Sequence, residues 1–204
     1  VAGPTQWETI AALAKSRHQE GYRVLLVCSA VASVTNRLTA LADHPESRTG
    51  YAELLAIHQT LSDQLNVDAN TWLPEAEHRL RECLGRLTLD PDPAARAALL
   101  GMGEWMSTRI GVQYLQQTLD ATWVDAREAL KAAEERDLSL SRRWLSAACT
   151  AGADPDLQTK WASLSPILIT QGFIASSPEG ETVLLGRGGS DTSAALLAGR
   201  LGAK

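Results

Sequence analysis

The feature that most constrains the fold is a short apolar run, Arg23-Val24-Leu25-Leu26-Val27-Cys28, which follows a helical pattern. Residues from about Gln6 to Gln19 carry apolar side chains at helical spacing, and Gly21 ends the pattern. Thr5 and Glu8 match a capping box at its start. The apolar run predicts a strand buried on both faces. A helix leading into such a strand indicates an α/β sandwich with a parallel core.

The rest of the chain combines a long helical region with short strands. Helices are expected over 34–119, with interruptions at 43–45, 70 and 90–93, and helical composition resumes at 126–136. Strands are expected at 121–124 and 166–171, and a turn at 177–180 leads into a hairpin strand at 181–185. The final segment predicts a helix from Ser190 to Leu201, with Ser190 as its N-cap and Asp191 in its first turn.

Composition narrows the class of protein. A chain of 204 residues with 45% hydrophobic and 21% charged residues suits one soluble domain. The net charge of −5 argues against a nucleic-acid partner, and no apolar run approaches the ~20 residues that span a membrane. The first residues lack the basic lead and apolar core of a signal peptide. Cys28, Cys83 and Cys149 are far apart without a CxxC pair, which favours reduced thiols in a cytoplasmic protein and no metal site.

The stretch Leu185-Gly186-Arg187-Gly188-Gly189-Ser190-Asp191 is expected to join a strand to a helix start. Glycines allow several backbone N–H groups to point into one space, where anions bind. Arg187 can grip a carboxylate with two hydrogen bonds. Asp191 beside a bound anion requires a lysine or a metal ion to balance its charge. The plainer interpretation is a hairpin exit in which the glycines serve only the turn.

Two further segments are candidate ligand sites. Residues 28–36 leave the first strand with small residues and hydroxyls, where ligands bind in open α/β sheets; a plain turn capped by Ser33 or Thr35 is the alternative. On the helix around Glu104, the side chains of Glu104, Ser107 and Thr108 share one face. An acid among hydroxyls suits a ligand amine or hydroxyl, and a solvated helix face is the alternative.

Together these segments resemble the aspartate kinases of the amino acid kinase superfamily. The family's serine-alanine turn and Thr-Asn pair correspond to Ser29-Ala30 and Thr35-Asn36, and its Gly-Glu-x-x-Ser helix to residues 103–107. Its Gln-Gly-Phe strand matches residues 171–173, and its Leu-Gly-Arg-Gly-Gly-Ser-Asp block is complete at 185–191. Residues 124–127 resemble a segment of the lysine-sensitive branch. The resemblance covers essentially the whole chain in order, and Ser33 departs from it where many members have glycine.

The resemblance implies a three-layer αβα sandwich of the amino acid kinase type, with a mainly parallel sheet. It implies transfer of the ATP γ-phosphoryl to the β-carboxylate of L-aspartate, giving 4-phospho-L-aspartate, with Mg²⁺ on the phosphates. L-aspartate would contact five residues: Ser29, Thr35, Glu104, Arg187 and Ser190. The amides of Gly188 and Gly189 would lie near the transferred phosphoryl, and Asp191 would orient a catalytic lysine.

The resemblance also implies that the chain is a fragment, residues 1–204 being part of a catalytic domain with a helical insert at about 46–119. The family's opening Lys-Phe-Gly-Gly-Thr-Ser strand, which carries the catalytic lysine, would end just before Val1. The adenine pocket and the regulatory ACT domains would follow Lys204. We therefore expect the fragment alone to be inactive and its parent to be a cytoplasmic homo-oligomer.

Two alternatives remain open from sequence. One is another kinase of the superfamily, acting on a different small acid or on a nucleotide. The other is a non-catalytic module that binds aspartate without phosphoryl transfer.

Overall fold

The centre of the molecule is a parallel three-stranded sheet. The computed structural model describes residues 3–134 and 137–203. Within them β1 (Val24–Cys28), β3 (Ile167–Gln171) and β2 (Ala121–Trp123) pair in the order β1-β3-β2. Cys28 lies opposite Gln171, so the carboxyl ends of β1 and β3 are side by side. The expected parallel core is confirmed.

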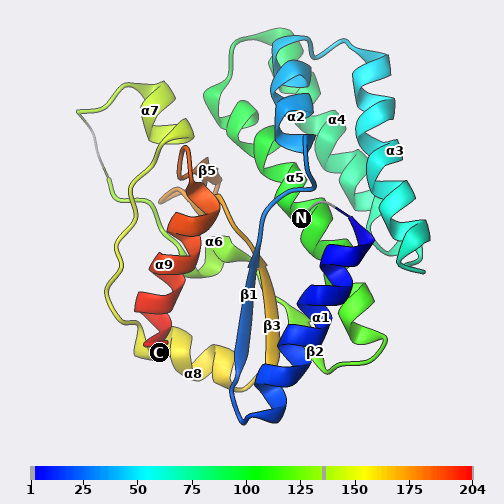
Figure 1. Ribbon diagram of the computed structural model, residues 1–204. Helices are drawn as coiled ribbons and strands as arrows, with labels where there is room; N and C mark the ends of the chain where they lie inside the picture. Colours follow the sequence, from blue (N-terminus) through cyan, green and yellow to red (C-terminus); the bar gives the residue numbers. More distant parts are fainter. Residues whose placement is uncertain (1–2, 135–136, 204) are drawn as a thin grey trace.

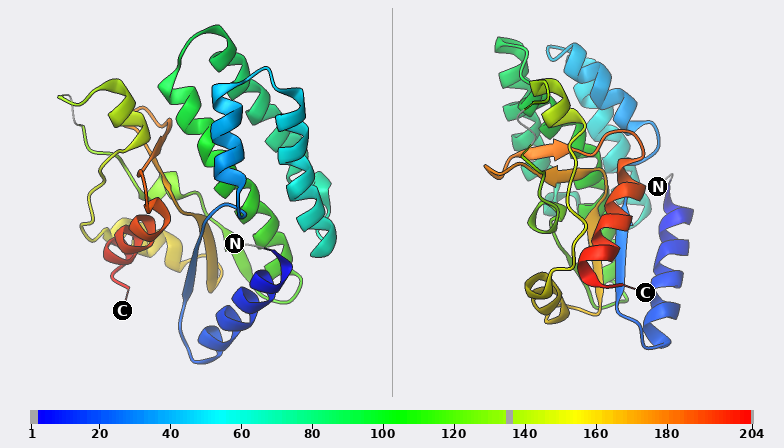
Figure 2. Two further views of the ribbon diagram at one scale, coloured as in Figure 1. Left: turned by 45° about the horizontal axis from the view of Figure 1, so that its top comes forward. Right: turned by 90° about the vertical axis from the view of Figure 1, so that its left-hand side faces the viewer.

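Helices cover both faces of this sheet, as Figures 1 and 2 show. Alternate side chains of β1 enter two different clusters because successive side chains of a strand point to opposite faces. On one face, Val24, Leu26 and Cys28 pack with α1 (Pro4–Gln19) and α5 (Pro93–Gln116). On the other face, Leu25 and Val27 pack with α8 (Pro155–Ala162) and α9 (Gly189–Leu201). The expected three layers, helix on sheet on helix, are therefore present.

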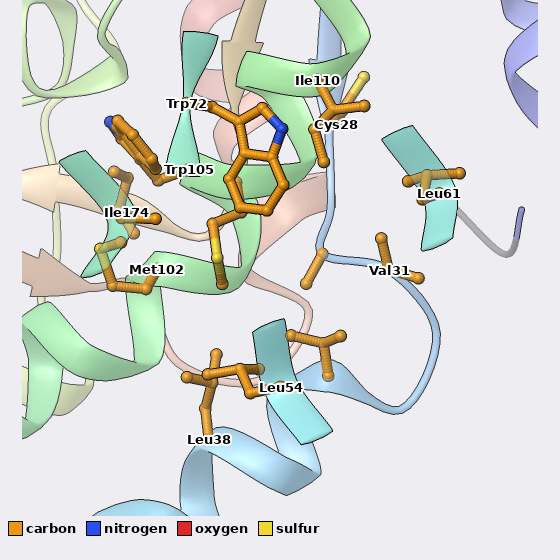
Figure 3. Packing of buried hydrophobic residues seen from close by; sticks show 14 of the residues in the cluster. Cys28, Val31, Leu38, Leu54, Leu61, Trp72, Met102, Trp105, Ile110 and Ile174 are labelled. Carbon is orange, nitrogen blue, oxygen red and sulfur yellow. The ribbon is translucent and has the colours of Figure 1, made fainter. Parts of the chain in front are cut away.

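A group of helices surrounds the N-terminal half of α5 (Figure 1). It consists of α2 (Val34–Asp43), α3 (Arg48–Gln64), the 3₁₀ turn η1 (Ala69–Thr71) and α4 (Leu73–Leu89). Figure 3 shows Trp72, Leu38 and Leu54 in the core that these helices form, and all three side chains are fully buried. The breaks between the helices fall at the turn-forming residues that the sequence indicates. None of the helices in residues 3–134 and 137–203 is long and apolar enough to cross a membrane.

A small antiparallel hairpin completes the fold. Strands β4 (Ile174–Ser176) and β5 (Thr182–Leu184) pair with Ile174 opposite Leu184, which confirms the expected hairpin. Beside it lie two short helices, α6 (Ala126–Ala129) and α7 (Leu140–Leu145). Phe173, between β3 and β4, has a φ of 68°, so the chain turns sharply where the parallel sheet ends.

Four expectations about local structure are wrong. Gly3 rather than Thr5 is the N-cap of α1, because Pro4 already occupies the first turn. Gly188, not Ser190, is the N-cap of α9. The helix expected over 126–136 ends at Ala129, and residues 135–136 lie outside the described part. Residues 24–27 are only half-buried, because β1 is an edge of the described sheet.

Candidate active site

The carboxylate of Glu104 is buried at the centre of α5. The residue is 3% exposed, and its Oε1 accepts a hydrogen bond of 3.1 Å from the Ala30 backbone N–H. Its Oε2 has no hydrogen-bond partner among the described residues. Burial raises the pKa of the Glu104 carboxyl to about 7, against the lowering effect of the Ala30 N–H. The alternative of a solvated helix face is excluded.

Gly103 allows α5 to approach the turn that follows β1. A Cβ at this position would lie 2.8 Å from the Ala30 Cβ and 3.0 Å from Val34 Cγ1. Any side chain here would push the two elements apart and break the Ala30–Glu104 hydrogen bond. The Gly-Glu pair is thus explained by packing as well as by charge.

The turn between β1 and α2 carries the hydroxyl residues that the sequence singles out. Ser29 follows the last residue of β1 and is half-buried. Ser33 is the N-cap of α2 with φ 67°, a left-handed conformation, and its side chain makes no capping hydrogen bond. Thr35 lies half-buried in the first turn of α2. Ser33 therefore takes the N-cap position that the plain-turn alternative gave it, but its hydroxyl does not cap the helix.

The glycine turn joins β5 to α9. Gly186 and Gly188 have φ values of 75° and 71°, which glycine adopts without steric cost. Arg187 between them is exposed and makes no ion pair with the described residues, so its guanidinium is open to a ligand. Asp191 is exposed in the first turn of α9. The N-terminal amides of this helix have no side-chain cap, which is typical of a helix start that can bind an anion.

Gly172 brings the glycine turn to the end of the sheet. Its N–H donates to the Cys28 carbonyl at 2.9 Å, which extends the pairing of β1 and β3 by one residue. A Cβ on Gly172 would lie 2.7 Å from Ser190 Oγ, so Ser190 packs directly on this backbone. Gly189 packs in the same way on Phe173, whose Cδ2 would lie 2.6 Å from an added Cβ. The Gln-Gly-Phe segment therefore seats the start of α9 on the sheet.

These contacts place most of the expected site residues around one sheet end. Ser29 and Glu104 are joined through Ala30, and Ser190 meets the same end through Gly172. Arg187, Gly188 and Gly189 precede Ser190 in the same turn. No described side-chain contact joins Thr35 or Asp191 to the others.

Two polar residues near the site, Ser107 and Gln171, belong to segments that the sequence singled out but were not among the expected ligand contacts. Ser107, one turn after Glu104, is fully buried, and its hydroxyl has no hydrogen-bond partner among the described residues. Gln171 is fully buried and accepts from the Ala126 N–H at 3.0 Å. The sequence signals for Gln171 were its place in the Gln-Gly-Phe segment and its polarity at the end of an apolar strand.

The arrangement can hold a small molecule that carries both charges. A buried carboxylate with a free oxygen suits an ammonium group, because it is costly to leave either charge unpaired. Arg187, which has no ion pair in the described part of the chain and lies beside the start of a helix, suits a carboxylate or phosphate. The described residues contain no group of three acidic, histidine or cysteine side chains that could hold a metal ion.

A larger cavity lies elsewhere and is mostly apolar. It has a volume of about 860 Å³ and is lined by residues of β1, α8 and α9, among them Leu25, Val27 and Ala194. It offers few polar groups for catalysis, and none of the expected site residues lines it. We place the candidate active site at the Glu104 end of the sheet for this reason.

Comparison with known proteins supports a kinase architecture. The model of the amino acid kinase family matches residues 1–204. The lysine-sensitive aspartokinase 3 of Escherichia coli K12 is 35% identical over 191 residues, which cover 85% of this chain and 39% of that protein. An aspartokinase of Chlamydia muridarum is 28% identical, with 84% of this chain and 38% of that protein covered. The chain thus spans about two fifths of the length of these relatives.

Solved structures agree. The structure of E. coli aspartokinase III in complex with aspartate and ADP superposes with a TM-score of 0.73 at 30% identity, covering 97% of this chain and 44% of that one. Clostridium acetobutylicum aspartate kinase has a TM-score of 0.68 at 17% identity over 97% of this chain and 42% of that one, a likeness of fold alone. The chain belongs to the amino acid kinase family, and the relatives named here are aspartokinases.

Proposed function

We propose that this chain is the aspartate-binding part of an aspartate kinase. The whole protein would transfer the γ-phosphoryl of ATP to the β-carboxylate of L-aspartate. A carboxylate oxygen attacks the γ-phosphorus, the bond to the bridging oxygen breaks, and ADP and 4-phospho-L-aspartate result. The observation that carries this proposal is the buried, half-satisfied carboxylate of Glu104 at the same sheet end as the glycine turn, whose Arg187 makes no ion pair with the residues that the structure describes.

The two ends of the substrate would be held by opposite charges. Glu104 Oε2 would accept from the α-ammonium, and the guanidinium of Arg187 would donate two hydrogen bonds to a carboxylate. The hydroxyls of Ser29, Thr35 and Ser190 would complete the shell of hydrogen bonds. Such a clamp fixes the reacting carboxylate in one position, and positioning is the main source of rate in phosphoryl transfer.

The amides of Gly188 and Gly189 would lie nearest the transferred phosphoryl group. Gly188 is the N-cap of α9 and Gly189 is its first residue, and the N-terminus of a helix favours negative charge. Mg²⁺, bound by phosphate oxygens, would neutralise charge that develops there. Asp191 would orient a catalytic lysine supplied by a segment outside these 204 residues. The helical stretch at about 46–119 would be an insert in this catalytic domain, and the whole protein a cytoplasmic homo-oligomer.

The test uses the full-length protein that carries these residues, supplied with MgATP, hydroxylamine and either L-aspartate or L-glutamate. Hydroxylamine traps an acyl phosphate as a hydroxamate, so we expect aspartyl hydroxamate and no glutamyl product. Product from a different acid would indicate another kinase of the family. Saturable aspartate binding by a folded protein without any product would indicate a binding module and would refute the kinase proposal.

A further inference from the structure

A second cavity, of about 280 Å³, lies between α4, α5 and the β4–β5 hairpin. It is next to Gly101, where an added Cβ would lie 2.9 Å from Ile174 Cγ2 of the hairpin. Gly103 and Glu104 instead contact the turn after β1. The lining contains none of the residues expected in the active site, so this cavity is a separate feature.

Apolar side chains and the amide of Gln171 line this cavity together with the part-buried Arg127, whose guanidinium is paired with Asp125 and donates to Thr182. Met102, Trp105 and Ile174 are all buried and lie next to one another, as Figure 3 shows. Gln171 lines the cavity and is itself fully buried. Its Oε1 is used, accepting from the Ala126 N–H and from the Thr170 hydroxyl, whereas its Nε2 has no hydrogen-bond partner among the described residues. A buried donor without an acceptor is unfavourable, and a ligand oxygen would correct this.

The outer part of the cavity carries charges of both signs. Arg79 binds Glu75 through Nε and Nη2, which leaves its Nη1 without a described hydrogen bond. Glu82 also lines the cavity, is exposed, and makes no ion pair within the described part of the chain. Glu181, on the hairpin side, is paired among the described residues with Arg86 Nη1 alone, at 3.8 Å. The cavity therefore offers two donors without a described acceptor, on Gln171 and Arg79, and two carboxylates, of which Glu82 has no described ion pair and Glu181 has a long one.

We propose that this cavity binds a small amino acid with an apolar side chain. Its carboxylate would accept from Gln171 Nε2 and Arg79 Nη1, and its ammonium group would lie between Glu82 and Glu181. The apolar side chain would contact Met102 and Ile174. A volume of about 280 Å³ suits a molecule of this size. The proposal does not depend on the reaction catalysed at the Glu104 site.

The chain provides its own reporter for this site. It contains only two methionines, and both are in α5. Met102 lines the cavity, whereas Met106 is fully buried and does not. The full-length protein is labelled with ¹³C-methyl methionine, and the signals of Met102 and Met106 are identified as those that disappear in Met102→Leu and Met106→Leu. L-valine is then titrated as the probe, and we expect a saturable shift of the Met102 signal and little change at Met106.

Matched probes and variants make the test specific. Isovalerate, which lacks the ammonium group, and isobutylamine, which lacks the carboxylate, should each bind more weakly than L-valine. Glu82→Gln should weaken the binding of L-valine about threefold, which is the effect of losing one exposed ion pair. Glu77→Gln, on the same helix but paired with Arg81 outside the cavity, should leave it unchanged. No saturable Met102 shift up to about 10 mM L-valine, or equal binding of all three probes, would overturn the proposal.

Discussion

The Glu104 carboxylate and the Ala30 backbone form a 3.1 Å hydrogen bond that joins α5 to the turn after β1. Glu104 Oε1 is the acceptor, and its Oε2 is left without a described partner in a site from which water is largely excluded. This carboxyl therefore holds α5 against the turn after β1 and still has one oxygen that can accept a hydrogen bond from a ligand.

The first prediction concerns stability against pH. Because burial raises the pKa of Glu104 from 4.5 to about 7, the folded chain keeps a proton that the unfolded chain releases near pH 4.5. The free energy of unfolding should therefore fall as pH rises between these values, by on the order of 3 kcal/mol, and stay level above them. Glu104→Gln, which can still accept from Ala30, should lack this decrease.

Urea unfolding of both proteins from pH 5 to 8 measures this difference. Burial lowers the pKa of His58 to about 4, so His58 makes stability rise with pH below about 6.5 and opposes the Glu104 effect. Both proteins contain His58, so it cancels in the comparison. The same dependence on pH in both proteins would contradict the assignment.

The second prediction concerns Ser33, whose φ of 67° is unfavourable for any residue with a Cβ. Ser33→Gly should raise the free energy of unfolding by about 0.5–1 kcal/mol, the relief of strain exceeding the entropy that glycine loses on folding. Ser33→Ala keeps the strain and should give no gain. A loss of stability in Ser33→Gly would show that the Ser33 hydroxyl has a role that the structure does not reveal.

The third prediction compares two helical glycines. A Cβ on Gly111 would lie 1.9 Å from Cη2 of the buried Trp7, so Gly111→Ala should destabilise the chain by about 2–3 kcal/mol. Gly85 in α4 has no neighbouring atom within 4 Å of an added Cβ. Gly85→Ala should stabilise it by about 0.5–1 kcal/mol. Thermal unfolding checks both, and equal effects of the two substitutions would be inconsistent with the packing of Trp7 on α5.

The fourth prediction concerns Gly172, where an added Cβ would lie 2.7 Å from Ser190 Oγ and 2.9 Å from Ser190 Cα. Gly172→Ala should move the start of α9 away from the sheet and lower kcat/KM for L-aspartate at least about tenfold, because small misplacements of a substrate clamp are costly. Gly152→Ala, with no neighbour within 4 Å, is the matched control. Unchanged kinetics in Gly172→Ala would separate Ser190 from the active site.

The elements could be predicted from sequence where local patterns determine them. The apolar runs of β1 and β3 and the turn residues between the long helices gave strands and helices close to those observed. The N-cap of α9 was predicted wrongly, because the left-handed conformation of Gly188 starts the helix before Ser190. The helix after Ala126 was predicted too long, because residues 131 and 132 form single β-bridges that composition does not reveal.

The candidate site was predictable in its residues but not in its contacts. Glu104 and Arg187 could be singled out because their charges stand in unusual surroundings of glycine and apolar residues. The hydrogen bond to Ala30 and the packing of Gly172 on Ser190 join segments far apart in the sequence, and only the tertiary fold reveals them. That Gln171 Nε2 has no partner among the described residues likewise depends on which buried groups its Oε1 meets.

The most direct test of the account is calorimetric titration of L-aspartate into the full-length protein in two buffers of different ionisation enthalpy. At pH 6 the free Glu104 carboxyl is mostly protonated, and the substrate ammonium would favour its charged form. We therefore predict release of roughly 0.9 proton for each aspartate bound at pH 6 and almost none at pH 8. Binding with no proton release at pH 6, or with the same release at both pH values, would contradict the role assigned to Glu104.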